Sequence, residues 1–162
     1  MKKINKQIDK RTVNLRTGKG GEAAVMSELL FRGYNASLLS VDAGIDIAAL
    51  KDGRTYLIQV KTKHWSKRSQ FLVNLELGAL NRYVESNAFL VLVGRDRATK
   101  LNDYIILPIK VLDDTSKGLR LKVNKKGKDF FNFIFRKRKD GEITLGKYGP
   151  ITKYKNAWGL IK

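Results

Sequence analysis

The chain has 162 residues, 43% of them hydrophobic and 30% charged, which is enough material for one domain with a core and too apolar for a disordered chain. It contains no cysteine, which excludes disulfide bonds, a cysteine-ligated zinc site and a thiol nucleophile. Its 33 Lys and Arg against 15 Asp and Glu give a net charge of +18, which favours nucleic acid over an anionic membrane surface as partner.

No segment approaches the roughly 18 consecutive apolar residues of a membrane helix, and the basic first residues lack the apolar stretch of a signal peptide. We therefore expect a cytoplasmic, intracellular protein. The excess positive charge is concentrated towards the two ends of the chain. Residues 1–81 hold 14 basic and 7 acidic side chains, residues 82–114 hold 5 of each, and residues 115–162 hold 14 and 3.

Residues 1–16 are basic and contain few apolar side chains, which predicts a flexible arm or a short helix outside the core. After a glycine-rich stretch, residues 22–32 have the composition of a helix, and Gly33 is expected to end it. Apolar side chains follow Glu22 at helical spacing. Glu22 is therefore expected on the buried face of the helix, in its first turn.

Three strands are expected next, at residues 34–41, 45–50 and 55–62. Residues 42–44 are predicted to form a turn or bulge between the first two strands. Asp52-Gly53 is the signal of a tight hairpin, which would place the second and third strands side by side.

The rest of the chain continues the alternation of helix and strand. The patterns predict a helix at 75–86, strands at 88–93 and 104–107, a short helix opened by Pro108, strands at 119–123, 130–135 and 142–146, and a helical turn at 156–161. The fold class is therefore mixed α/β, with a central mixed β-sheet flanked by helices and extra basic C-terminal strands. We expect one domain over residues 17–162, with its core at 17–112 and a β-rich extension at 113–162.

Asp46 lies in an otherwise apolar strand, where a carboxylate is costly unless a metal or a partner compensates its charge. On the next strand Gln59 and Lys61 share one face, because side chains alternate along a strand. The predicted hairpin brings this strand beside Asp46, and the helix that carries Glu22 must pack on the sheet. The four side chains can then converge on one site. The alternative is a buried salt bridge of Lys61 with Asp46 or Glu22.

An acidic residue at a helix start, Gly44-Ile45-Asp46 on a strand, a hairpin, and Gln59-Val60-Lys61 on the next strand together resemble the PD-(D/E)XK nuclease superfamily. The resemblance covers about residues 20–63 and implies a restriction-endonuclease-like core. Gln59 stands where most members have Glu or Asp. The Gln-x-Lys form resembles group I intron homing endonucleases of this fold, and archaeal Holliday-junction resolvases are more distantly similar.

By this resemblance the catalytic residues are Glu22, Asp46, Gln59 and Lys61, and the cofactor is Mg²⁺, for which Mn²⁺ would substitute. Asp46 would be the main metal ligand and Glu22 a second one, with the Gln59 amide oxygen and the Val60 carbonyl as neutral ligands. Lys61 would orient or deprotonate the attacking water, or neutralise developing charge. Gln59 removes one negative charge from the site, so weaker metal binding than in an all-carboxylate site is expected.

Basic side chains around the site and in the C-terminal third are expected to contact DNA. The residues predicted for this role are Lys19, Lys63, Trp65, Lys67, Arg68, Arg120, Lys122, Lys125, Lys126, Arg136 and Arg138. Trp65 would either stack on a base or pack in the core. His64, the only histidine, is interpreted as a surface or DNA-contacting residue.

Six further aromatic positions are expected to be structural. Phe131, Phe133 and Phe135 are predicted to line one sheet face in the core, and Tyr148, Tyr154 and Trp158 are predicted to be core or oligomer contacts.

The leading hypothesis is a Mg²⁺-dependent DNA endonuclease of the homing type. A Holliday-junction resolvase or a restriction-type enzyme of the same fold is the alternative, and a non-catalytic DNA-binding module is the alternative of another class. The expected substrate is double-stranded or branched DNA. One site per chain implies a homodimer or homotetramer for cutting both strands.

Overall fold

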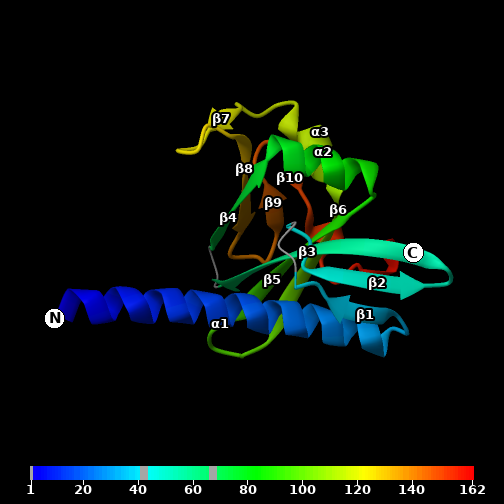
Figure 1. Cartoon of the computed structure of the whole chain (residues 1–162), viewed down its shortest axis with the longest axis horizontal. Helices are drawn as coiled ribbons and strands as arrows, with labels where there is room; N and C mark the ends of the chain where they lie inside the picture. The colour runs from blue at the N-terminus through cyan, green and yellow to red at the C-terminus, as the bar shows by residue number, and fades with distance from the viewer. Residues whose placement is uncertain (1, 41–43, 66–68) are drawn as a thin grey trace.

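The computed structural model describes residues 2–40, 44–65 and 69–162, with the backbone alone described for residues 2–10. It contains two β-sheets and three α-helices (Figure 1). The expected mixed α/β class is therefore confirmed. Among the described residues, no helix combines the length and the apolar character needed to span a membrane.

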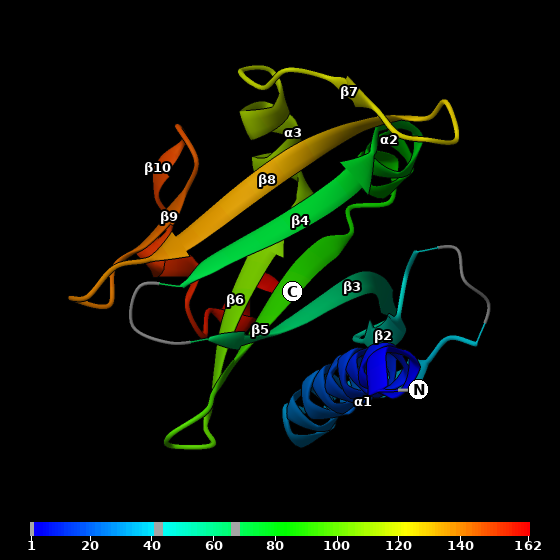
Figure 2. The same cartoon turned by 90° about the vertical axis from the view of Figure 1, so that its left-hand side faces the viewer.

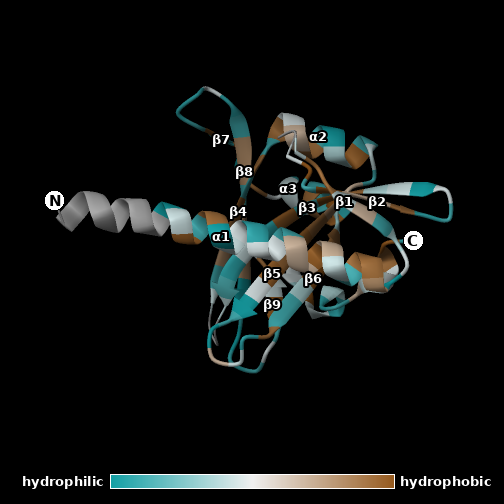
Figure 3. Cartoon of the chain, turned by 60° about the horizontal axis from the view of Figure 1, so that its bottom comes forward, coloured by the Kyte–Doolittle hydropathy of each residue, from teal (hydrophilic) through white to brown (hydrophobic). Residues whose placement is uncertain are grey.

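The first helix, α1 (Lys2–Phe31), is a single helix of 30 residues that runs through the glycine-rich stretch. The predicted helix at 22–32 is only its second half, and the predicted start was wrong. Val25 and Leu29 are fully buried in that second half, whereas residues 13–16 are exposed. The N-terminal half extends past the sheets (Figures 1 and 3). The expected basic arm is thus continuous with the helix that carries Glu22.

A five-stranded mixed sheet forms the centre of the fold. Its strand order is β1-β2-β3-β5-β6, with β3 and β5 parallel and the other neighbours antiparallel. The strands are β1 (Asn35–Leu38), β2 (Ile47–Lys51), β3 (Arg54–Trp65), β5 (Phe89–Asp96) and β6 (Asn102–Pro108). All of them match predicted strands, although β1 is shorter than the predicted 34–41 and part of the predicted turn at 42–44 lies outside the described residues.

The hairpin between β2 and β3 has the conformation that its sequence predicts. Asp52 and Gly53 both have positive φ, 50° and 72°, as a type I′ turn requires, and Lys51 pairs with Arg54. This tight turn fixes the register in which Ile47 faces Ile58. The register in turn decides which β3 residues lie beside Asp46.

A second, antiparallel sheet has the order β10-β9-β8-β4, and β7 pairs with the first residues of β8. Its strands are β4 (Gln70–Glu76), β7 (Lys122–Val123), β8 (Asp129–Lys137), β9 (Ile143–Leu145) and β10 (Gly149–Pro150). The C-terminal strands were expected, but β4 was not. Phe71, Val73 and Leu75 alternate with exposed residues along β4 and are buried in the core between the two sheets, with Leu90 and Leu92 of the mixed sheet.

Four short helical segments complete the chain. They are α2 (Leu77–Glu85), α3 (Ile109–Ser116) and the 3₁₀ turns η1 (Thr152–Tyr154) and η2 (Trp158–Leu160). Brown and teal alternate along α2 in Figure 3, as expected for a helix with one buried face. Pro108 precedes α3 directly, as predicted. The predicted helix at 75–86 and the closing helical turn are confirmed in shorter form.

The mixed sheet is covered on both faces, and each face has its own core. On one face α1 and η2 pack against Ile58, Val60 and Val91. On the other face the antiparallel sheet, α2 and α3 pack against Leu90 and Leu92. Figure 2 shows α1 on one side of β3 and the β4–β8 pair on the other. This arrangement lets α1 reach the edge of β3 where β2 ends.

The aromatic predictions for the C-terminal third are confirmed with one exception. Phe131, Phe133, Phe135, Tyr154 and Trp158 are buried. Tyr148, predicted to be a core or oligomer contact, is 44% exposed and so does not belong to the core, whereas the oligomer alternative stays a prediction. Tyr148 follows the buried strand β9 in the short turn to β10, where a side chain faces solvent.

Candidate active site

Helix α1 crosses β3 at an unusually close point, at Gly21. A Cβ atom placed on Gly21 would lie 1.7 Å from Thr62 Oγ1, so no side chain fits between the helix and the strand there. Glu22 follows Gly21, and Lys61 precedes Thr62. The close crossing therefore brings the part of α1 that carries Glu22 next to the part of β3 that carries Lys61.

Asp46 lies at the point where β2 stops pairing with β3. Its N–H donates to the Ile58 carbonyl at 3.0 Å, and its Oδ2 accepts a 2.7 Å hydrogen bond from the Val60 N–H. The Asp46 carboxylate thus accepts a hydrogen bond from β3 at the position where a backbone carbonyl would accept it if the pairing of β2 with β3 continued. Because the N–H and C=O of one strand residue face the same neighbour, the Val60 carbonyl is also directed to the Asp46 side.

The surroundings of Asp46 raise its pKa above the ordinary range. Burial is the largest cause, and the charge of Glu22 adds to it; the Val60 N–H and the charges of Lys61 and Lys19 act in the opposite direction. These couplings show that Glu22, Lys61 and Lys19 lie near enough to act on the Asp46 charge. The structure therefore brings three of the four predicted catalytic side chains together.

Lys19 holds the Glu22 carboxylate in an ion pair of 2.7 Å on the same face of α1. The Glu22 side chain is 13% exposed, so this pair is largely shielded from water on the carboxylate side. Lys19 was predicted only as a DNA contact. Its spacing of three residues before Glu22 is the signal that predicts the pairing.

Gln59 is 6% exposed, and its Oε1 has no hydrogen-bond partner among the described residues. Its Nε2 lies 3.7 Å from the position that a Cβ atom of Gly44 would occupy, two residues before Asp46. Tyr83 of α2 closes the same region, because its hydroxyl is 2.0 Å from that position. A buried amide oxygen without a partner is costly, so a cation or a polar ligand would stabilise it.

The donor set suits a hard divalent cation that keeps most of its waters. No three His, Cys, Asp or Glu side chains cluster within the described part of the chain. Two carboxylates, from Asp46 and Glu22, lie within electrostatic reach of each other, and the Val60 carbonyl and Gln59 Oε1 add neutral oxygens. Mg²⁺ is typically bound by one or two carboxylates together with water and substrate phosphates. The residues present therefore fit Mg²⁺.

The predicted DNA contacts next to Lys61 have different outcomes. Trp65 is 1% exposed and packs against Phe71 with ring centroids 6.0 Å apart. It belongs to the core, and the prediction that it contacts DNA was wrong. Lys63 is exposed, and its Nζ donates to the Gln70 carbonyl at 2.7 Å. Lys67 and Arg68 lie outside the described residues.

The basic residues of the C-terminal third occupy two places rather than one. Arg120, Lys122, Lys125 and Lys126 are exposed on and around the β7–β8 hairpin, at one end of β8. Arg136 and Arg138 lie at the other end, about 27 Å away by the rise of a strand. Arg138 is also engaged by Glu142 at 2.6 Å. The β7–β8 hairpin is therefore basic, but it does not include the two arginines.

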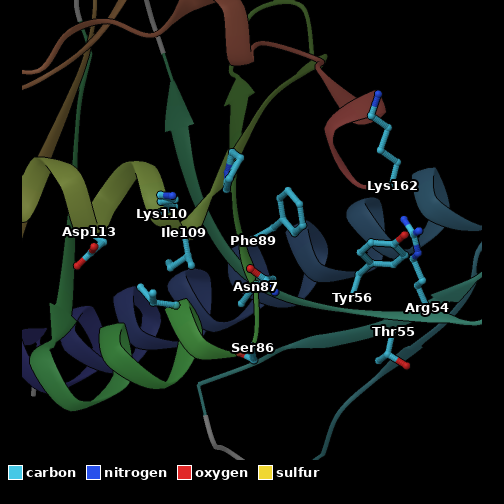
Figure 4. A pocket seen from close by; sticks show the side chains of 13 residues that line it. Arg54, Thr55, Tyr56, Ser86, Asn87, Phe89, Ile109, Lys110, Asp113 and Lys162 are labelled. Atoms are coloured by element: carbon cyan, nitrogen blue, oxygen red, sulfur yellow. The ribbon is translucent and has the colours of Figure 1, made fainter.

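A cavity of about 780 Å³ lies at the beginning of β3, away from Asp46. Figure 4 shows Arg54, Tyr56 and Lys162 on one side of it and Lys110 and Asp113 on the other. Among the described residues, Asp113 is the one acidic side chain that lines it, and none of the predicted site residues does. The cavity therefore lacks the paired acidic groups of a metal-dependent hydrolytic site.

Comparisons with known proteins found a likeness in structure but none in sequence. No protein-family model matches the chain, and no curated protein does. A Holliday junction resolvase, Hjc from the archaeal hyperthermophile Archaeoglobus fulgidus, is similar in structure, with a TM-score of 0.45 and 18% sequence identity. The match covers 70% of this chain and 81% of the resolvase. At this level of similarity the function has to be argued from the geometry of the site itself.

Proposed function

We propose that the protein is a Mg²⁺-dependent endonuclease that hydrolyses phosphodiester bonds in DNA. The observation that carries the proposal is Asp46, a half-buried carboxylate with a raised pKa that is fixed by the Val60 N–H beside Glu22 and Lys61. A half-buried acid pair beside a lysine, on a chain of net charge +18, suits a polyanionic substrate and a bound cation.

Each residue has a distinct part in this proposal. Asp46 and Glu22 would hold Mg²⁺, with Gln59 Oε1 and the Val60 carbonyl as neutral ligands. Bound Mg²⁺ would supply positive charge to the phosphate oxygens and polarise a water molecule. The Lys61 ammonium would orient the attacking water and offset the negative charge that develops on the phosphate.

Within this class we favour the homing type, on the Gln-Val-Lys sequence at positions 59–61. A junction resolvase would instead recognise the shape of branched DNA, and a restriction-type enzyme would cut a short palindrome. Cleavage of a four-way junction in preference to linear duplex would select the resolvase among the three.

A non-catalytic DNA-binding module is the second candidate, and the Lys19–Glu22 ion pair favours it. Glu22 already has a cationic partner at 2.7 Å, so the acidic pair could be balanced by Lys19 and Lys61 without a metal. The two functions differ in their need for Mg²⁺. A binding module would bind DNA equally well in Mg²⁺ and in EDTA and would not cut it.

The deciding experiment is cleavage of supercoiled plasmid and of a synthetic four-way junction, in Mg²⁺ or in EDTA. Asp46→Asn is the sharpest variant, because an amide oxygen can still accept the Val60 N–H while the negative charge is lost. We expect Asp46→Asn and Lys61→Ala to lower the cleavage rate by about 100-fold or more. DNA binding, measured by gel shift in EDTA, should stay within a few-fold of wild type.

Lys110→Ala is the matched control, because it removes one exposed lysine that lies on α3. It should cut at the wild-type rate. Cleavage that persists in EDTA or in Asp46→Asn would contradict the proposed site. If neither substrate nor a random-sequence library is cut while binding persists, the binding module is the correct function.

We further propose that two copies act together. One chain carries one candidate site, so a cut through both strands requires at least a dimer, and twofold symmetry is the usual arrangement. Light scattering with and without DNA should show a dimer or tetramer under cleavage conditions. A monomer in both states would leave only single-strand nicking.

A further inference from the structure

A second polar cavity lies on the α1 face of the mixed sheet, where α1 leaves the sheet and begins to project. Its volume is about 480 Å³. The side chains that matter are Arg16 and Thr17 of α1, Thr62 and His64 of β3, Arg95 of β5 and Asn102 of β6. We call it the α1 pocket. Alternation along β3 puts Thr62 and His64 on the opposite face from Lys61, so the α1 pocket is separate from the candidate active site.

The ionisable side chains that line the α1 pocket, among the described residues, are all basic. Two guanidinium groups and one imidazole line it, and within the described residues no Asp or Glu side chain does. Gly20 and Gly21 of α1 also line the pocket and add no side chain of their own to it. Such a cavity attracts an anion, and nothing that lines it compensates its positive charge.

Two buried polar atoms in this pocket have no partner among the described residues. They are His64 Nδ1 and Thr62 Oγ1. A buried donor or acceptor left without a hydrogen bond costs free energy, so a ligand or water that contacts them is favoured. This observation is independent of the charge, and it also indicates a polar ligand.

The arginine at the back of the pocket is held in place. Arg95 Nη1 donates to Asn102 Oδ1 at 3.2 Å, and Asn102 Nδ2 in turn donates to the Tyr104 hydroxyl at 3.1 Å. One of the five guanidinium donors is used in this way, so a fork of donors is left for a ligand. A preorganised guanidinium fork matches the oxygens of a phosphate group.

We infer that the α1 pocket binds a phosphate group, held between Arg16 on the helix and Arg95 with His64 on the sheet. The phosphate is distinct from the one that would be cleaved at Asp46. Its chemistry is shared by a backbone phosphodiester of DNA and by a free or terminal phosphate monoester. A phosphate in this position would bridge α1 to β3 and β5 at the point where the helix begins to project.

His64 makes the inference directly testable, because it is the only histidine and its imidazole gives a single set of NMR signals. The protein is titrated with sodium phosphate in EDTA, at constant ionic strength balanced with sodium chloride. We expect a saturable shift of the His64 signals with phosphate and none with chloride. Arg95→Gln and Arg16→Gln should each weaken phosphate binding by about tenfold.

Two further titrations identify the source of the phosphate. One uses a 5′-mononucleotide, and the other uses a short duplex without terminal phosphates. If the duplex shifts His64 and inorganic phosphate competes with it, the ligand is a DNA phosphodiester. If only the monoesters shift His64, the ligand is a free or terminal phosphate.

The inference is overturned if no phosphate compound moves the His64 signals, or if the shift persists unchanged in both arginine variants. Lys147→Ala, which removes one exposed lysine outside the pocket, is the charge-matched control and should bind phosphate as wild type does. Thermal melts establish that the variants are folded, as expected for substitutions at an exposed and a half-buried arginine. Because the titrations need neither Mg²⁺ nor cleavage, their result is separate from the outcome of the nuclease experiment.

Discussion

At the scale of single residues, Gln59 is the position expected to set how strongly the proposed site holds a cation. Its buried amide oxygen has no hydrogen-bond partner among the described residues, and as an amide it can serve as a neutral ligand only. Gln59→Glu adds a negative charge at the same place, and two opposite charges about 4 Å apart interact by several kcal/mol in a partly buried site.

We therefore expect Gln59→Glu to bind Mg²⁺ about tenfold more tightly than wild type, by isothermal titration calorimetry at pH 8. Without Mg²⁺ the variant should be less stable, because it buries an uncompensated carboxylate. Mg²⁺ should then raise its melting temperature more than that of wild type. An equal or weaker affinity would show that Gln59 does not face the metal.

At the scale of elements, replacing two glycines of α1 by alanine is expected to change the stability of the protein in opposite directions. A Cβ on Gly21 would overlap Thr62, whereas one on Gly18 would meet no atom within 4 Å. We expect Gly18→Ala to stabilise the protein by about 1 kcal/mol through helix propensity. Gly21→Ala should destabilise it by about 2 kcal/mol through overpacking. Urea unfolding of the two variants measures both free energies.

A third variant distinguishes the steric overlap of residue 21 with Thr62 from the effect of helix propensity. Adding Thr62→Ala to Gly21→Ala removes the two atoms of Thr62 beyond Cβ, so part of the lost stability should return. No recovery in the double variant would mean that the helix does not cross β3 at this contact.

The elements also show which parts of the fold can be predicted from sequence. The hairpin at Asp52-Gly53 and the strand with Gln59 and Lys61 were predicted because their signals are local. The start of α1 was not, because the glycines lower helix propensity; the structure gives a packing reason for Gly21, its contact with Thr62, and none for Gly18 or Gly20. Strand β4 carries a visible period of two, but the apolar pattern that starts at Leu75 was interpreted as helical.

The candidate site, like the fold, could be predicted from sequence only in part. The residue types at 22, 46, 59 and 61 follow from sequence, and so does the pairing of the two strands. The hydrogen bond from the Val60 N–H to Asp46 could not be predicted, because it depends on where β2 ends. The pairing of Lys19 with Glu22 could have been predicted from their spacing of three residues on one helix, but the sequence analysis considered Lys19 only as a DNA contact.

At the scale of the whole molecule, Asp103 joins the two sheets. This β6 carboxylate accepts from Lys137 of β8 at 2.7 Å and pairs with Lys155, just after η1, at 2.8 Å. Burial alone would raise the pKa of Asp103, but the hydrogen bonds and charges of the two lysines outweigh it and hold the pKa below its usual value. The ionised form is therefore favoured in the folded state.

Because the folded-state pKa is depressed, the stabilisation from Asp103 is fully present above the unfolded pKa of about 3.9 and is lost as pH falls towards the lower folded value. Asp103→Asn should cost about 2 kcal/mol at pH 7. The difference from wild type should shrink below about pH 4. Unfolding free energies from urea titrations at pH 7 and pH 3 test this; a difference that is the same at both values would contradict it.

The close crossing of α1 over β3 has a mechanical consequence. Glu22 lies one residue from the crossing, whereas Lys2 lies about 28 Å away along the helix axis. The crossing is thus the fixed point from which the outer end of α1 extends. If the protein acts on DNA as proposed, a bend confined to the exposed N-terminal half of α1 would move its outer end by several ångströms while Glu22 stayed almost still, so the basic arm would adjust to the DNA without disturbing the acidic pair.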